Sequence, residues 1–304
     1  WLVEEIGVLD NGNGMDPLLQ RASIKFQDGS HQRGLKRGGA TKQMGKFGVG
    51  LPQASISQAR RVEVYTWTDG GHETSTYTYL DFDEPSTFRT VPRPVAKRIP
   101  KKWLQAAEIW EDSGTLVIWS KLDRFSWKTS KSVHRNTEYV VGRMYRKHLS
   151  EDNVGIRIAA YEDDPPWKPR WTDRDGDNVR STDETHDWMI QANDPLYLDA
   201  NAFADNPPES PMFEHMGTEV LKFEIKDKDG NSRSEEVTLT FSIAKPSARE
   251  GHGYDPKKHQ QGLGGKQPHG LHAKNNIGLS IVRARRELEL DDGYSVAVKN
   301  AAWE

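Results

Sequence analysis

Two glycine clusters, each directly followed by a helix-like segment, restrict what this chain can fold into. The first, DNGNGM at residues 10–15, follows the apolar run 6–9 and precedes a segment, 16–26, with helical periodicity. Pro17 suits the first position of this helix, and its predicted apolar stripe comprises Leu18, Leu19, Ala22 and Phe26. A carboxylate at the end of a strand can accept a hydrogen bond from an amine, and the two glycines let the backbone approach a flat ligand closely. An Asp-Gly turn that caps a helix has the same pattern, so both interpretations stay open for this cluster alone.

The second cluster, GKFGVGLP at residues 45–52, opens the helix-like segment 51–59. Closely spaced glycines at a helix N-terminus expose free backbone N–H groups and the positive end of the helix dipole, and together these bind phosphate. The patterns of a P-loop and of a dinucleotide-binding loop are both absent. A tight packing turn explains the cluster equally well.

A third segment, SGT at residues 113–115, leads into a short apolar strand, 115–119. A threonine at the mouth of a central strand can direct its hydroxyl to a bound base or to a water beside that base. An ordinary strand threonine has the same appearance, so Thr115 gains meaning only from the two clusters before it.

The remaining pattern predicts an α/β (α+β) chain with two globular parts. Further strands are predicted over 61–67, 75–82, 156–161 and 277–282, a helix over 133–149, a β-hairpin over 217–245 with an Asp-Gly turn, and a long loop over 246–276. The acidic segment 162–194 divides the chain, which predicts domains over 1–161 and 195–304 with a linker or insertion between them.

Composition narrows the function classes. The 28 aromatic residues are enough for packed cores although only 35% of the 304 residues are hydrophobic. The absence of cysteine excludes disulfides, thiol catalysis and cysteine-based zinc sites. The formal net charge of −3 gives no global attraction to nucleic acid, and no apolar run is long enough to span a membrane. A cytoplasmic protein without a membrane partner is therefore expected.

Taken together, the three segments resemble the GHKL ATPase superfamily, which includes the ninety-kilodalton heat-shock chaperone, MutL, gyrase B, the MORC proteins and sensor histidine kinases. DNGNGM is similar to the D-x-G-x-G-M box of these ATPases, KFGVGLPQAS to their second glycine box, and SGTLVIW to their third box. The resemblance covers residues 1 to about 160. It implies a two-layer Bergerat-type ATP-binding sandwich.

The resemblance also implies roles for individual residues. Asp10 would accept a hydrogen bond from the adenine amino group, Thr115 would support that network, and Met15 would pack on the base. Gly12 and Gly14 would shape the wall of the site. The expected set on the phosphate side comprises Lys46, Phe47, Gly48, Val49, Gly50 and Leu51, of which the last four would present backbone N–H groups.

Two further segments fit this resemblance. Residues 28–46 occupy the position of the ATP lid and carry five Lys or Arg residues against one acidic residue, which suits a loop that closes over a triphosphate. The segment IGLSIVRARREL is similar to a late strand of a transducer domain with a mostly antiparallel sheet. Lys274 is then the candidate γ-phosphate contact, with Lys266 as second choice, whereas a solvated loop lysine is the alternative.

One family motif is not found. GHKL ATPases carry a helix with a water-activating Glu and a Mg²⁺-binding Asn before the D-x-G-x-G strand, but this chain has only nine residues before Asp10. We therefore expect the chain to lack that helix, and the sequence identifies neither a general base nor a metal-ligand set.

These features predict an ATP-binding protein, and an ATPase in the complete protein, with ATP and Mg²⁺ as cofactors. The expected partner is a second copy in an ATP-gated homodimer, acting on a nucleic acid or protein client as MORC or MutL do, with prokaryotic defence as one such role. The alternatives are an ATP-gated binding module without hydrolysis and a chaperone-type ATPase. A histidine kinase is disfavoured because no phosphoacceptor helix pairing is visible.

Overall fold

The computed structural model describes residues 2–25, 50–107, 110–152, 154–161, 187–198, 213–226, 230–245, 276 and 278–291. The chain divides into two compact units, of which the first contains 1–135 with 158–188 and the second contains 136–157 with 189–304. The domain ranges expected from the sequence, 1–161, 162–194 and 195–304, stay a prediction.

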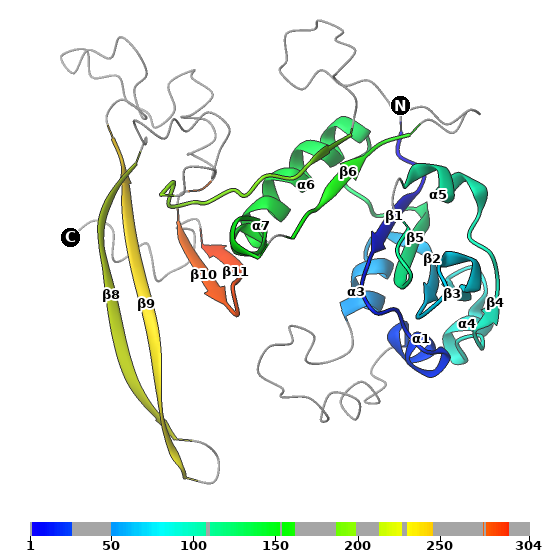
Figure 1. Cartoon of the computed structure of the whole chain (residues 1–304), viewed down its shortest axis with the longest axis horizontal. Coiled ribbons are helices and arrows are strands. Elements are labelled where there is room, and N and C mark those ends of the chain that lie inside the picture. Colours follow the sequence, from blue (N-terminus) through cyan, green and yellow to red (C-terminus); the bar gives the residue numbers. More distant parts are fainter. Residues whose placement is uncertain are drawn as a thin grey trace, which may run out of the picture. The chain divides into compact units, whose positions relative to one another are not determined.

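The first unit is built on a five-stranded antiparallel sheet in the order β1-β5-β2-β3-β4 (Figure 1). Its strands are β1 (Ile6–Asp10), β2 (Ala59–Trp67), β3 (Thr76–Asp81), β4 (Val95–Ala96) and β5 (Gly114–Leu122). The strands expected from the apolar runs 6–9 and 115–119 and from alternation over 61–67 and 75–82 are confirmed, and so is the mixed α/β fold class. The last of these strands along the chain, β5, lies between β1 and β2, so the sheet brings distant segments together.

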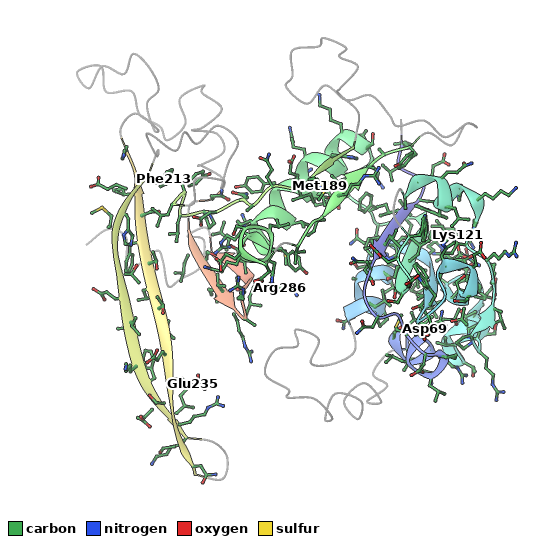
Figure 2. All side chains as sticks on the ribbon, in the orientation of Figure 1. Asp69, Lys121, Met189, Phe213, Glu235 and Arg286 are labelled. Carbon is green, nitrogen blue, oxygen red and sulfur yellow. The ribbon has the colours of Figure 1, made fainter. Side chains whose placement is uncertain are left out.

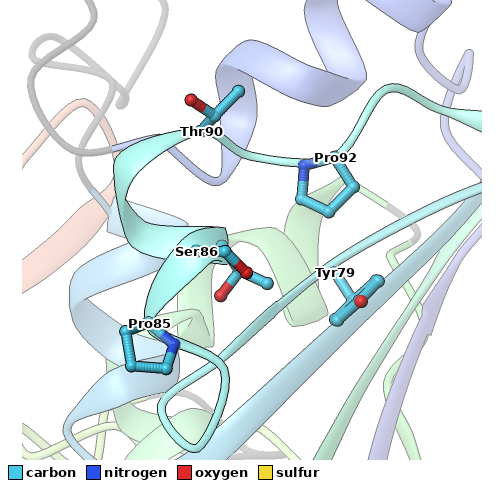
Figure 3. Close-up of a pocket in the computed structure, with 6 residues that line it drawn as sticks. Tyr79, Pro85, Ser86, Thr90 and Pro92 are labelled. Atoms are coloured by element: carbon cyan, nitrogen blue, oxygen red, sulfur yellow. The ribbon is translucent and has the colours of Figure 1, made fainter.

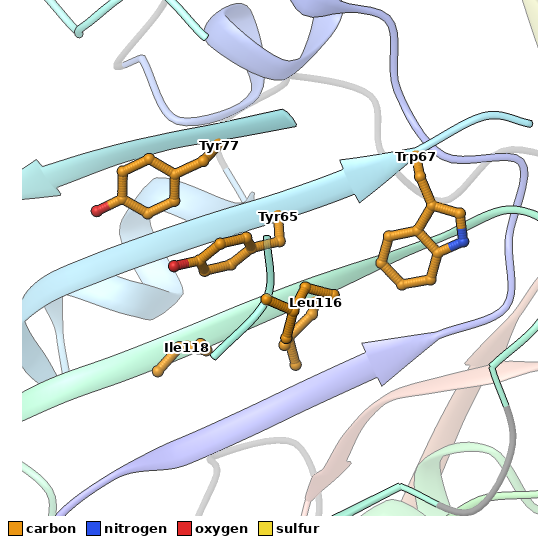
Figure 4. Packing of buried hydrophobic residues seen from close by; sticks show 6 residues of the cluster. Tyr65, Trp67, Tyr77, Leu116 and Ile118 are labelled. Atoms are coloured by element: carbon orange, nitrogen blue, oxygen red, sulfur yellow. The ribbon is translucent and has the colours of Figure 1, made fainter. Parts of the chain in front are cut away.

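Alternation along the strands separates two apolar faces. On one face, Val62 and Val64 of β2 pack with Ile24, which follows α1 (Pro17–Ser23), and with Leu51 of α3 (Gly50–Ile56). On the opposite face, a second cluster includes the buried residues Tyr65, Trp67, Tyr77, Leu116 and Ile118 (Figure 4). Ile99 and the partly buried Trp103 of α5 (Lys101–Ala106) join this second cluster. The short elements η1 (His72–Thr74) and α4 (Pro85–Arg89) also belong to the first unit.

The helix α1 begins where the sequence predicts but buries a different face. Its N-cap is Asp16, whose Oδ1 accepts from the backbone N–H groups of Leu18 (2.8 Å) and Leu19 (2.9 Å). The predicted apolar stripe is wrong at Leu18, which is 84% exposed. Gln20 is buried instead, because its Nε2 donates to the carbonyl oxygens of Val64 and Thr76, both at 3.0 Å.

In the second unit, the expected single helix over 133–149 is interrupted. The structure has α6 (Ser130–Met144), which begins in the first unit, and then α7 (Arg146–Glu151). Arg146 at the break donates from Nη1 to the carbonyl oxygen of Arg143 (2.9 Å) and to Oε2 of the buried Glu287 (3.0 Å). Glu287 belongs to β11 (Arg286–Asp291), which pairs antiparallel with β10 (Leu279–Arg283).

Two more strand pairs are described. The predicted hairpin is confirmed as β8 (Phe213–Lys226) and β9 (Ser232–Ala244), which pair antiparallel along their whole length. The short strands β6 (Arg157–Ala159) and β7 (Asp187–Met189) pair with one another. Most of the expected linker and all but Asn276 of the expected loop 246–276 lie outside the described residues.

Candidate functional site

The three motif segments meet at one end of the first unit's sheet. In the strand register, Asp10 of β1 lies directly opposite Thr115 of β5, and Thr115 lies opposite Thr66 of β2. Residues opposite one another in an antiparallel pair project to the same face of the sheet. A carboxylate and two hydroxyl groups therefore form a single row across three strands.

Hydrogen bonds connect this row to the first glycine cluster. The Thr66 hydroxyl accepts from the backbone N–H of Met15 (2.9 Å) and donates to the carbonyl oxygen of Gly114 (3.0 Å). Its Oγ1 also lies 3.1 Å from Oγ1 of Thr115. Thr66 was not among the residues expected from the sequence, because its only local signal is that of an ordinary threonine in an alternating strand.

Gly14 has a conformation and a packing position that exclude a side chain. Its φ is +67°, and a Cβ built there would lie 2.0 Å from the carbonyl oxygen of Trp67. The other expected glycine of this cluster, Gly12, donates its backbone N–H to Oδ1 of Asp10 at 2.9 Å. The two glycines thus hold the turn against the sheet and orient the carboxylate.

The environment of Asp10 changes its acidity. The residue is exposed, but the surrounding protein partly desolvates its carboxylate, and this desolvation raises the pKa of Asp10. Hydrogen bonds from the backbone of Gly12 and Thr115 stabilise the ionised form and oppose this rise in pKa. An ionised, partly desolvated carboxylate is a strong acceptor for an amine donor.

The start of the second helix lies on the same face of the sheet as Asp10. Leu51 and Met15 are both partly buried against the apolar cluster formed by Val62 and Val64. On that face, Trp119 Nε1 donates to Ser55 Oγ of α3 at 2.9 Å, which holds the helix on the strand that carries Thr115. Gly50 is the first residue of α3. Of the expected phosphate-side set, Lys46, Phe47, Gly48 and Val49 lie outside the described residues, as do the expected lid 28–46, Lys266 and Lys274.

Comparison with known protein families gives a match over the N-terminal part of the chain. Residues 2–105 match the family model for Histidine kinase-, DNA gyrase B-, and HSP90-like ATPases. The match supports a GHKL-type ATPase domain in this part of the chain and, with it, ATP binding. It includes Asp10, Met15 and Leu51 and ends before β5, so Thr115 joins the site through the strand register. No curated protein matches the chain.

Other features of the described residues do not belong to this site. A surface hollow between β3 and α4 is lined by Tyr79, Ser86 and Thr90 together with two prolines, and it contains none of the expected nucleotide-site residues (Figure 3).

Within the described ranges, no group of three or more His, Asp or Glu side chains could hold a metal ion, so we assign no Mg²⁺ ligand. None of the helices in these ranges is both long enough and apolar enough to cross a membrane.

Proposed function

We propose that this chain binds ATP at the Asp10–Thr115 row and that the complete protein hydrolyses it. The observation that carries the proposal is the opposition of Asp10 and Thr115 on the sheet face that also packs against Leu51 of α3. Nucleotide-driven lid closure and dimerisation would then control an activity directed at DNA or protein, of the MORC or MutL type. A role in prokaryotic defence is one form of this activity.

Adenine recognition rests on hydrogen-bond complementarity. The Asp10 carboxylate accepts hydrogen bonds, and the exocyclic amine of adenine donates them. Guanine presents a carbonyl oxygen at the equivalent ring position, which would place two acceptors against one another. A site that pairs a buried or partly desolvated polar group discriminates strongly against a ligand that leaves the group unpaired. We therefore expect ATP to bind and GTP to be rejected.

On the phosphate side, the proposal assigns the backbone N–H groups of residues 48–51 and the cations of the lid 28–46. Lys274 is the proposed contact to the γ-phosphate. Closure would follow from population shift, since lid and lysine contact phosphate only in the closed state. Bound Mg²⁺ would neutralise charge on the phosphates during hydrolysis.

The experiment measures binding and hydrolysis separately. Calorimetric titration with ATP and GTP reports binding, and phosphate release reports hydrolysis, for this chain and for a protein extended at its N-terminus. Binding of ATP but not GTP, with phosphate release from the extended protein, is the expected result. ATP binding without phosphate release from either protein would instead favour the ATP-gated module that does not hydrolyse nucleotide. Failure of both proteins to bind ATP would reject the site.

A further inference from the structure

The β8–β9 hairpin has one mostly apolar face that no other described element covers. In the strand register, seven apolar side chains project to the same face: Leu221, Phe223, Ile225, Val237, Leu239, Phe241 and Ile243. All except the half-buried Leu239 are exposed, with Phe241 and Ile243 each 49% exposed. Figure 2 shows the hairpin's side chains projecting from the two strands between Phe213 and Glu235.

The opposite face of the hairpin is polar. It carries mostly Thr, Ser, Lys and Glu side chains, with Val220 in its middle and Phe213 and Ala244 at the end away from the turn. Among the described elements, β8 and β9 pack extensively only with one another. A two-stranded hairpin is at best marginally stable in water, and a sheet with one apolar face normally buries that face against another layer. The hairpin therefore has the pattern of half of a two-layer structure.

We propose that the apolar face of the β8–β9 hairpin is a nucleotide-independent interface with the same face of a second copy of this chain. Its seven side chains expose on the order of 600 Å² per copy, so stacking two faces would bury on the order of 1,200 Å², the lower end of specific interfaces. Pairing of the free strand edges would leave the apolar face in water, whereas stacking of the two faces buries it. Two sheets stacked in this way lie about 10 Å apart.

Charge on the apolar face selects the orientation of the two copies. The turn end carries Arg233 and Glu235, which form an ion pair at 3.1 Å, the other end carries Glu214, and Glu219 lies opposite Leu239 near the middle of the face. A twofold axis along the strands would place the two copies of Glu214 near one another and cost energy through repulsion. An axis across the strands makes the hairpins antiparallel, so that Arg233 approaches Glu214 of the partner subunit.

The antiparallel arrangement also places a large side chain of one copy opposite a glycine of the other. Gly217 lies near one end of the apolar face and Phe223 near the other, at equivalent distances from its centre. Stacking β8 on the β8 of the partner subunit therefore places Phe223 over Gly217 of the partner subunit, where no side chain occupies the space. The large side chain of one copy thus meets the smallest residue of the other.

Two valines provide a matched test. Val237 lies on the apolar face and is 47% exposed, whereas Val220 lies on the polar face and is 51% exposed. In the absence of nucleotide, sedimentation analysis of the full chain should show a dimer at micromolar concentration. V237E should raise the dimer dissociation constant by about tenfold or more, because it buries a charge in the interface, and V220E should change it less than about twofold.

Further results bear directly on the proposal. A wild-type chain that stays monomeric, or equal effects of V237E and V220E with unchanged circular dichroism, would overturn it.

Arg233→Glu should weaken the dimer, and adding Glu214→Arg should restore it. A double variant that dimerises as weakly as Arg233→Glu would contradict the antiparallel arrangement. Because every measurement is made without nucleotide, failure of ATP binding would leave these results unaffected, and the two proposals fail independently.

Discussion

At the level of single residues, Asp10 has to stay ionised in surroundings that favour its protonated form. Desolvation raises its pKa, and N–H groups of Gly12 and Thr115 only partly offset that rise. A ligand that donates a hydrogen bond should stabilise this carboxylate, because the ligand replaces the hydration that the carboxylate has lost. The same property makes the carboxylate unfavourable for the free protein.

The variant Asp10→Asn tests the ligand side of this property. Asparagine can place an amide oxygen at the same position, but it lacks the charge, so ATP affinity should fall about tenfold to a hundredfold. Titration calorimetry measures the change. Asp123→Asn is a matched control, since Asp123 directly follows the far end of β5 from Thr115. Equal affinities of wild type and Asp10→Asn would place adenine elsewhere.

The same substitution, Asp10→Asn, should lower ATP affinity but raise the stability of the folded protein. Because the pKa of Asp10 is raised in the folded state, its favourable contribution exists below the unfolded pKa and is lost as pH rises through the folded pKa. Asp10→Asn should therefore have a higher free energy of unfolding than wild type at neutral pH, and the gain should disappear in acid. Urea unfolding at a series of pH values measures this, and a variant that is less stable at neutral pH would contradict it.

Gly14 tests whether the turn must lie against the sheet. Gly14→Ala combines a positive φ with a Cβ placed 2.0 Å from a backbone oxygen, so the free energy of unfolding should fall by about 3 kcal/mol or more. Gly71→Ala is the control: Gly71 has φ +78° but its Cβ would meet nothing within 4 Å, so only about 1 kcal/mol should be lost. Similar losses for both variants in urea unfolding would show that steric contact at Gly14 is unimportant.

At the level of elements, buried ion pairs attach β11 to the helices of the second unit. Glu287 is 2% exposed and accepts from Arg143 Nε (2.6 Å), Arg146 Nη1 (3.0 Å) and Ser280 Oγ (2.6 Å). Arg143 lies before the break at Tyr145 and Arg146 after it, so the one carboxylate holds both helix segments.

Neutralising Glu287 should therefore destabilise the second unit. Glu287→Gln leaves two guanidinium groups without their buried counter-charge, and the free energy of unfolding should fall by about 3 kcal/mol. Glu289→Gln, two residues along the same strand at an exposed position, should cost less than about 0.5 kcal/mol. Thermal unfolding followed by circular dichroism compares the two, and equal melting temperatures would reject the role of Glu287.

At the level of the whole molecule, the proposed cycle requires the second half of the chain to contact nucleotide bound by the first. Lys274→Ala should slow phosphate release from the complete protein by about a hundredfold, because a positive charge at the γ-phosphate is lost where negative charge develops. ADP, which lacks that phosphate, should bind with unchanged affinity. Lys222→Ala on the hairpin is the control. Loss of ADP binding in Lys274→Ala would place this lysine elsewhere in the site.

Local pattern was enough to predict most of the individual elements and the candidate residues on them. Alternation predicted β2, β3 and the long hairpin, an apolar run predicted β5, and Pro17 marked the start of α1. Local pattern did not predict two features, the burial of Gln20 and the break of the helix at Tyr145. Both depend on contacts with residues far away in sequence, namely Val64 and Thr76 for Gln20 and Glu287 for the segment after Tyr145.

The row of Asp10, Thr115 and Thr66 likewise follows from strand order. Periodicity states which side of a strand a residue occupies, but it carries no information on which strand becomes the neighbour. That choice depends on pairing β5 between β1 and β2, a long-range contact whose free energy comes from the packed sheet as a whole. The site thus consists of residues visible in the sequence, brought together by a register that only the folded sheet supplies.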